Sequence, residues 1–375
     1  MYEFSAPMPF EFEHIDKLVE INNNVTKSKI TSLYFGVPRN CFDLTGFESL
    51  RAHYDKYTSF EYWAERIVYS KEQGFDFVYL LNNPRAMTDI DKVLDMQLKQ
   101  LDKLMNNLRK IGCKKIRVAN IQLLNYILKM YPDMEIYAST TLEFNQIQQF
   151  QVFFDMYPSV KEIVPSFEAN KNFKMLANLR NQFSSFDIEL ITNEGCLSGC
   201  PSRIQHCISI PYLFTKNDLF SNRDEVFTSE LYLKKCMDYS KRNLSLDICK
   251  NKLIFPWEIE EYVKIGVNKF KLVGRNCDDF NNGKYMSSYE IYLTAIEDYD
   301  KVKDFPFSSL SHHFKAFGDF VTIDMIRKYL PKIEYFIKNG HLCSSMCGSE
   351  CTYCYDCAKE LDKVIKFVEE KKSGN

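Results

Sequence analysis

The sequence predicts a (β/α)8 barrel of the TIM-barrel type, with an insertion between its sixth and seventh strands and a cysteine-rich C-terminal segment. Three observations predict it: eight short β-rich runs recur along the chain, amphipathic stretches separate them, and about sixty residues divide the sixth run from the seventh. Short apolar runs that alternate with helices are typical of parallel strands. A doubly wound open sheet is the alternative, but no GxGxxG motif follows the first run.

The predicted strands share β-branched and aromatic side chains in runs of four to seven residues. They are residues 31–37, 76–82, 115–120, 134–139, 160–164, 186–192, 252–255 and 268–273. Runs of this length match barrel strands rather than helices.

The segments between the runs carry a helical pattern, which is clearest over residues 88–111. Leucine, isoleucine, valine and methionine recur there with a 3.6-residue period. Thr88 is a predicted N-cap, and Gly112 is a predicted C-terminal stop. Helices are also expected over residues 289–302 and 358–372.

The length of 375 residues exceeds the ~250 residues of an ordinary barrel. We therefore expect residues 1–300 to form the barrel, with the cysteine-bearing insertion at about 193–250. Residues 301–375 should form a helical segment that contains the cysteine-rich motif 343–357.

Composition excludes several classes of protein. The 48 basic and 50 acidic residues give a net charge of −2, which offers no general reason to bind nucleic acid. No apolar run approaches the ~20 residues of a membrane span, and the N-terminus lacks the pattern of a secretory signal. We expect a cytoplasmic protein with no membrane partner.

The 13 cysteines are an odd number, which argues against a disulfide scaffold, and they are unevenly distributed. Only Cys41 and Cys113 precede residue 190, so eleven cysteines crowd the second half of the chain. This asymmetry is the main indication of function.

The first cysteine cluster follows the sixth predicted strand. Cys196, Cys200 and Cys207 lie on a loop with glycine and proline, and Cys249 precedes the seventh predicted strand. Barrel chemistry sits at the C-terminal ends of strands, and Fe–S clusters need four thiolates. These four cysteines are the predicted ligands of a [4Fe–4S] cluster. His206 competes with Cys207, zinc is the alternative metal, and buried free thiols are the alternative to any metal.

The second cluster comprises five cysteines within fifteen residues, a density that core packing does not explain. A closed site would use four of them, with or without the first, for a second Fe–S cluster or a zinc ion. The five are Cys343, Cys347, Cys351, Cys354 and Cys357.

Part of this second cluster, C-x3-C-x2-C, matches the spacing of radical SAM proteins. That motif ordinarily follows the first barrel strand, whereas here it lies after the last strand. The spare cysteines beside it would also close the open iron site that S-adenosylmethionine needs. We therefore disfavour this interpretation.

Four short tracts together resemble the peptidase U32 family: "YASTTLEFNQ", "IELITNEGC", "LDIC" and "FKLVGR", in that order. The resemblance covers roughly residues 30–300. The matching positions are Glu189, Cys196, Cys249, Lys271, Gly274 and Arg275.

The resemblance implies a barrel-like fold. It also implies either a four-cysteine [4Fe–4S] enzyme for oxygen-independent hydroxylation or a collagenase-like protease, since the family contains both kinds of member. Cys196 and Cys200 are closer together than the family's cysteine pair, and Val273 stands where the family has glutamate. Substrate identity therefore does not carry over.

Other polar residues complete the predicted site. Glu194, Lys271 and Arg275 are the predicted catalytic residues, and Arg39 and Arg203 are predicted to bind an anionic co-substrate. Several arginines at a barrel mouth suit a carboxylate ligand.

The predicted function is an iron–sulfur enzyme that modifies an organic substrate. A peptidase is the alternative from another class, although the chain has neither GxSxG nor HExxH. A non-catalytic Fe–S electron-transfer or maturation protein, with a redox protein as partner, is the third. The sequence leaves open whether the substrate is a small anionic molecule, a peptide or RNA.

Overall fold

The computed structural model describes residues 1–36, 60–83, 94–207, 229–274, 284–311, 321–343 and 346–373. Within these ranges eight parallel strands form a closed barrel in sequence order, because β8 pairs with β1. The strands are β1 (Tyr2–Pro7), β2 (Ser28–Phe35), β3 (Asp76–Leu81), β4 (Lys115–Val118), β5 (Glu135–Ala138), β6 (Glu162–Ile163), β7 (Asp187–Ile191) and β8 (Lys269–Lys271). The predicted (β/α)8 architecture is confirmed.

Two strand assignments differ from the prediction. The N-terminal strand β1 was not predicted, because its sequence, YEFSAP, mixes polar and apolar residues and does not stand out as an apolar run. Residues 252–255, which were predicted to be a strand, are extended but lie outside the barrel sheet. Their Ile254 N–H donates to Thr192 O at 2.8 Å. The insertion therefore lies between β7 and β8.

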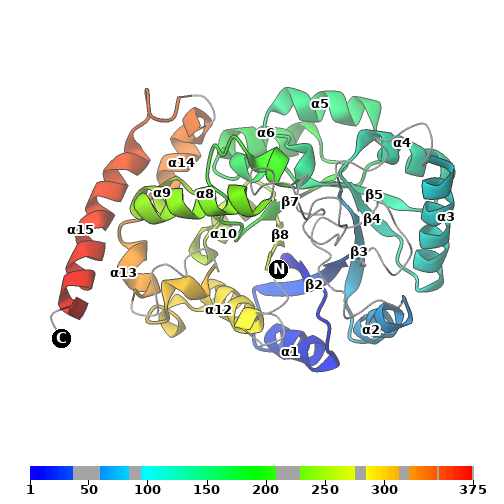
Figure 1. Cartoon of the computed structure of the whole chain (residues 1–375), viewed down its shortest axis with the longest axis horizontal. Coiled ribbons are helices and arrows are strands. Elements are labelled where there is room, and N and C mark those ends of the chain that lie inside the picture. Colours follow the sequence, from blue (N-terminus) through cyan, green and yellow to red (C-terminus); the bar gives the residue numbers. More distant parts are fainter. Residues whose placement is uncertain are drawn as a thin grey trace.

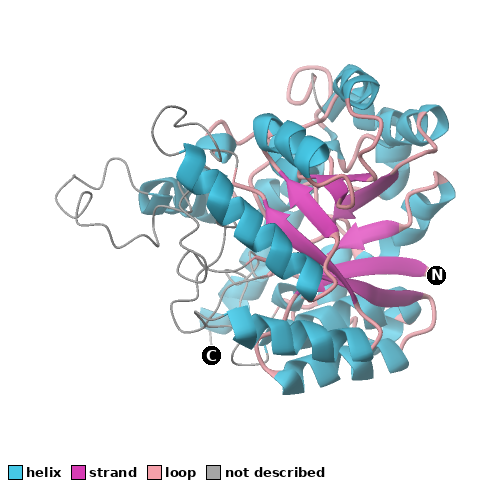
Figure 2. Ribbon diagram, turned by 90° about the vertical axis from the view of Figure 1, so that its right-hand side faces the viewer, coloured by secondary structure: helices cyan, strands magenta, loops and turns pink. Residues whose placement is uncertain are grey.

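Helices surround the strands, as the views from two directions show (Figures 1 and 2). The first six connections between consecutive strands contain, in order, α1 (Phe12–Asn23), α2 (Phe60–Glu72), α3 (Leu94–Lys110), α4 (Ile121–Met130), α5 (Ile147–Met156) and α6 (Phe173–Gln182). The long connection between β7 and β8 contains α8 (Ser229–Arg242), α9 (Leu244–Lys250) and α10 (Ile259–Lys264). The later helices are α12 (Lys284–Glu297), α13 (Ile323–Arg327), α14 (Ile333–Asn339) and α15 (Tyr353–Ser373).

Helix α4 illustrates how local sequence sets these elements. The Asn120 side chain caps its start by accepting a hydrogen bond from the Leu123 N–H, an arrangement worth about 1 kcal/mol. Leu123, Leu124 and Ile127 then recur on one face and are buried. This face packs into the apolar layer between the helices and the barrel.

The last helix covers one side of the molecule. Helix α15 packs against α9, and Figure 1 shows it beside α13 and α14 at the edge of the molecule. No helix within the described ranges is both long and apolar enough to span a bilayer.

The barrel interior is unusually polar. Tyr34, Val78, Leu80 and Tyr137 form a small apolar cluster inside it. Towards the N-terminal ends of the strands, charged side chains replace the branched apolar residues that ordinarily fill a barrel.

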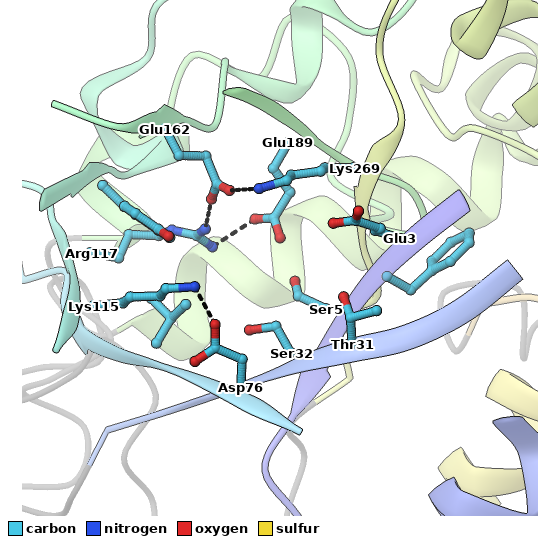
Figure 3. A pocket seen from close by; sticks show the side chains of 13 residues that line it. Glu3, Ser5, Thr31, Ser32, Asp76, Lys115, Arg117, Glu162, Glu189 and Lys269 are labelled. Atoms are coloured by element: carbon cyan, nitrogen blue, oxygen red, sulfur yellow. Dashed lines mark hydrogen bonds and ion pairs between the residues drawn. The ribbon is translucent and has the colours of Figure 1, made fainter. Parts of the chain in front are cut away.

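An arginine and two glutamates form the core of this polar region, and we call them the inner triad: Arg117, Glu162 and Glu189. The Arg117 guanidinium pairs with the Glu162 carboxylate, and its Nη1 lies 2.7 Å from Glu189 Oε2. The three side chains are only 2–5% exposed. The Lys269 ammonium, 3.4 Å from Glu162, extends the network towards solvent (Figure 3).

Candidate functional site

The C-terminal mouth of the barrel holds a small cavity of about 60 Å³. Side chains at the ends of several strands line it, together with the loop that follows β7. Catalytic residues of (β/α)8 enzymes lie at this end, so the mouth is the first candidate site. Its described lining includes Tyr34, Glu194, Arg203, Cys207 and Lys271.

Lys271 is the last residue of β8 and is almost fully buried at the mouth. Its ammonium lies 3.9 Å from the centre of the Tyr34 ring, a cation–π contact. The Tyr34 hydroxyl in turn donates to Leu272 O at 2.7 Å, which fixes the ring. The predicted catalytic Lys271 therefore faces the cavity from a rigid support.

A second arginine–glutamate group, which we call the mouth triad, consists of Arg203, Glu143 and Glu194. Arg203 Nε donates to Glu143 at 2.7 Å, and its Nη1 donates to Glu194 at 3.1 Å. Burial alone would lower the pKa of Arg203, but Glu194, Cys196 and Glu143 raise it well above its ordinary value. Arg203 is thus a fixed cation that positions Glu194.

The loop after β7 is held against the barrel by polar contacts. The Asn193 side chain accepts from Val273 N at 2.7 Å and donates to Val273 O at 3.0 Å, which ties the loop to the end of β8. Glu168 accepts from Gly199 N at 2.6 Å and from Ser198 Oγ at 3.1 Å. Gly199 has a φ of +71°, a conformation that favours glycine.

The four cysteines of the first predicted cluster do not converge. Cys196 donates to Glu194 Oε1 at 3.3 Å and, like Cys207, lies beside Arg203. Cys200 is placed next to Cys236, whose pKa is raised to about 11 by burial and by Cys200. Cys249 is buried in α9.

Cys249 instead lies near the second cluster. Burial raises the pKa of the Cys249 thiol, and Cys357 and Cys354 on α15 raise it further. This follows from the packing of α9 against α15, which the sequence did not indicate. The ligand set Cys196, Cys200, Cys207 and Cys249 stays a prediction, and the described conformation does not bring it together.

The C-terminal cysteines gather beside a buried lysine. Burial raises the pKa of Cys354 to about 12, while the neighbouring Lys252 lowers it and Cys343 and Cys347 raise it. Lys252 also lies against Cys343 and is 4% exposed. A buried ammonium facing several thiols would balance the negative charge of thiolates.

Two further contacts join Cys351 to this group. A backbone bridge pairs it with Cys347, and its Sγ lies 3.1 Å from the Tyr335 hydroxyl. Cys343, Cys347, Cys351 and Cys354 are therefore neighbours, and Cys357 lies near both Cys354 and Cys249. The donor set suits zinc or an Fe–S cluster chemically. Among the described residues, however, no three His, Cys, Asp or Glu side chains already have the arrangement of a metal site.

A groove of about 760 Å³ joins the two cysteine-rich segments. Cys200 and Cys236 line one part of it, and Cys343 and Cys347 line another. The sequence prediction assigned Cys200 to the first site, Cys343 and Cys347 to the second, and Cys236 to neither. Only the packing of the insertion helices against the C-terminal segment brings them to one groove.

Two predicted site residues, Arg39 and Arg275, lie outside the described residues, as do Cys41 and Cys277. The inner triad was missed from the sequence. Its signal was the alternation of charged and apolar residues in strands such as β4 and β7, which places the charges on one face.

Comparison with known proteins gives one curated relative and several solved structures. The relative is the "Uncharacterized protease MJ1657" of Methanocaldococcus jannaschii, 24% identical over 281 residues, which are 74% of this chain and 77% of the relative. The structure "The Structure of the U32 Peptidase Mk0906" matches 74% of this chain and 94% of its own, with a TM-score of 0.44 and 11% identity. The chain resembles the U32 peptidases.

These findings confirm the resemblance predicted from the sequence motifs. No family model matches the chain. The structure "Structure of CpGH84B" matches 99% of this chain and 74% of its own, at 10% identity and a TM-score of 0.35. Structural similarities this distant show nothing about the reaction, so the chemistry follows from the chain's own residues.

Proposed function

We propose that the chain is an iron–sulfur-dependent enzyme that modifies an organic substrate at the C-terminal mouth of its barrel, by oxygen-independent hydroxylation or a related reaction. One observation carries the proposal. The loop of residues 194–207 contributes Glu194, Arg203 and Cys207 to the mouth and Cys200 to the cysteine groove. The same segment therefore borders both the mouth and the groove, and the groove contains thiols from two distant parts of the sequence.

Cys343, Cys347, Cys351 and Cys354 are the thiols that best fit a cluster, because Lys252 supplies a buried positive charge beside them. A bound cluster would supply one-electron chemistry at the groove. Thiols with raised pKa values must lose their protons to bind iron, so cluster binding should release protons.

The chain's own mouth residues would bind and orient the substrate. The Lys271 ammonium is placed to hold an anionic group, and the Tyr34 ring restricts where that group lies. Glu194, held by Arg203, accepts the hydrogen bond of the Cys196 thiol and can take its proton. An anionic small molecule is the substrate class that this arrangement favours.

The relatives' names favour a peptidase as the second candidate, since one is called a protease and one a peptidase. A peptidase would use a thiol such as Cys207 at the mouth as nucleophile. A non-catalytic electron-transfer protein would bind the same cluster and turn over no substrate by itself.

Iron and sulfide assays on anaerobically purified protein, with visible and EPR spectra, test the proposal. We expect about four irons per chain, given one [4Fe–4S] cluster. Cys343→Ala and Cys354→Ala should each abolish most of the bound iron. Cys113→Ala is the matched control, because it removes a buried thiol between α3 and β4, far along the sequence from both cysteine-rich segments. This variant should retain the bound iron.

Protein that binds no iron would overturn the proposal. Peptide hydrolysis that survives both cysteine substitutions would favour the peptidase. An oxygen-resistant, reducible cluster with no substrate turnover would favour the electron-transfer protein.

A further inference from the structure

A second cavity, of about 240 Å³, opens at the opposite end of the barrel, among the N-terminal ends of the strands (Figure 3). Its floor contains the buried inner triad, whereas Asp76 and Lys115 stand at its rim with side chains 54% and 28% exposed. The cavity therefore leads from solvent to buried charges. It opens at the end of the barrel opposite the mouth where the proposed reaction takes place, and Arg117 lines both cavities.

The two sides of this cavity differ in chemistry. Arg117 and Lys115, both from β4, present hydrogen-bond donors on one side. On the other side, Glu189 and the short side chains of Ser5 and Ser32 present oxygen atoms (Figure 3). A ligand that lies between them would meet cations at one end and acceptors at the other.

Two buried polar atoms of the lining lack a hydrogen-bond partner among the described residues: Arg117 Nε and Ser32 Oγ. Arg117 is 2% exposed and Ser32 is half-buried. Buried polar groups are ordinarily satisfied, and each unsatisfied one costs free energy. One of the two atoms stands on each side of the cavity, so a single polar ligand could satisfy both.

The charge balance favours a ligand that is neutral overall. Four carboxylates line the cavity, those of Glu3, Asp76, Glu162 and Glu189, and three cations face them, those of Lys115, Arg117 and Lys269. A net anion would meet the excess of carboxylates, and a simple cation would leave Arg117 Nε unsatisfied. At ~30 Å³ per water molecule, the cavity holds about eight waters, which matches a ligand far smaller than a drug.

We propose that this cavity binds a small zwitterion of the size of an α-amino acid. The carboxylate of the ligand faces Arg117 and Lys115. Its ammonium, which has three N–H donors, faces Glu189, Ser5 and Ser32. The site is independent of any cluster in the cysteine groove.

Isothermal titration calorimetry on the full chain tests the proposal, with L-alanine as the zwitterion. Ethylamine and propionate are the matched half-ligands, since each keeps only one of the two charges. We expect L-alanine to bind more tightly than either half-ligand or an equimolar mixture of them.

Two serine variants locate the binding. Ser32→Ala should weaken L-alanine binding roughly fivefold, the effect of one hydrogen bond. Ser28→Ala is the matched control, because its Oγ is also buried with no hydrogen bond among the described residues but lies outside the cavity. It should leave the affinity unchanged.

Three results would overturn the proposal: no heat with L-alanine at millimolar concentrations, equally tight binding of a half-ligand, or equal effects of the two serine substitutions. The iron assay is unaffected by all three, so failure here is distinguishable from failure of the proposed function.

Discussion

The inner triad and the mouth triad contain the same three chemical groups, one guanidinium and two carboxylates, but they are held in different ways. Arg117, Glu162 and Glu189 come from the barrel strands β4, β6 and β7, whose register fixes them. In the mouth triad, Glu194 lies on the loop after β7, Arg203 begins the helical segment that follows this loop, and Glu143 lies in the turn after β5.

Burial separates the two groups further. The inner carboxylates are 5% exposed, whereas those of Glu143 and Glu194 are 22% and 11% exposed. A fully buried ion triad cannot be rehydrated without opening the barrel, but carboxylates on a loop can turn to water. The comparison teaches that the same chemistry serves the fold at one end and leaves freedom for a reaction at the other.

The largest expected effect tests the structural role of the inner triad. Arg117→Met would leave two buried carboxylates without their cation, and breaking a buried pair in this way costs about 3–5 kcal/mol. Urea denaturation should show that loss in the free energy of unfolding. The triple variant with Glu162→Gln and Glu189→Gln, which removes the charges together, should recover much of it. A loss below 1 kcal/mol would contradict the comparison.

A smaller effect is expected from Arg203→Met. Its two carboxylates are partly exposed and can regain water, so we expect a loss of about 1–2 kcal/mol. The same urea measurement checks it, with Arg109→Met, whose exposed side chain pairs with Asp133, as the control for a surface pair. If Arg203→Met proved as destabilising as Arg117→Met, the distinction between the two triads would fail.

The smallest effect concerns pH. Burial raises the pKa of Glu162 above its usual 4.5, and Glu189 raises it further, against the opposing Arg117 and Lys269. Just above pH 4.5 the folded protein therefore keeps a proton that the unfolded chain has released. The stability that this proton contributes is complete below pH 4.5 and is lost as the pH rises through the folded-state pKa, by at most about 1.4 kcal/mol per pH unit.

Urea midpoints measured across this pH range should fall as the pH rises. Glu162→Gln should flatten the slope, whereas Glu135→Gln on the neighbouring strand β5 should preserve it. An unchanged slope in Glu162→Gln would assign the pH dependence to other groups.

Much of the fold followed from sequence because local patterns dictate local structure. The apolar runs at β2, β3, β4, β5, β6, β7 and β8 were recognised, as was the long amphipathic helix α3. The false strand at 252–255 has a cause outside its own sequence. Whether an extended segment joins a barrel depends on which edge remains open, and β1 fills the place between β2 and β8.

The sequence by itself determined the composition of the site: a cysteine-rich loop after a strand, a lysine at the end of β8, and five cysteines near the C-terminus. Tertiary structure decided which of these meet. It placed Cys200 next to Cys236, Cys249 next to α15, and Lys252 against Cys343 and Cys354. The reason is physical: spacing along the chain fixes which side chains share a strand or a helix face. Contacts between segments far apart in the sequence depend on how α9 and α15 bury their apolar faces against each other.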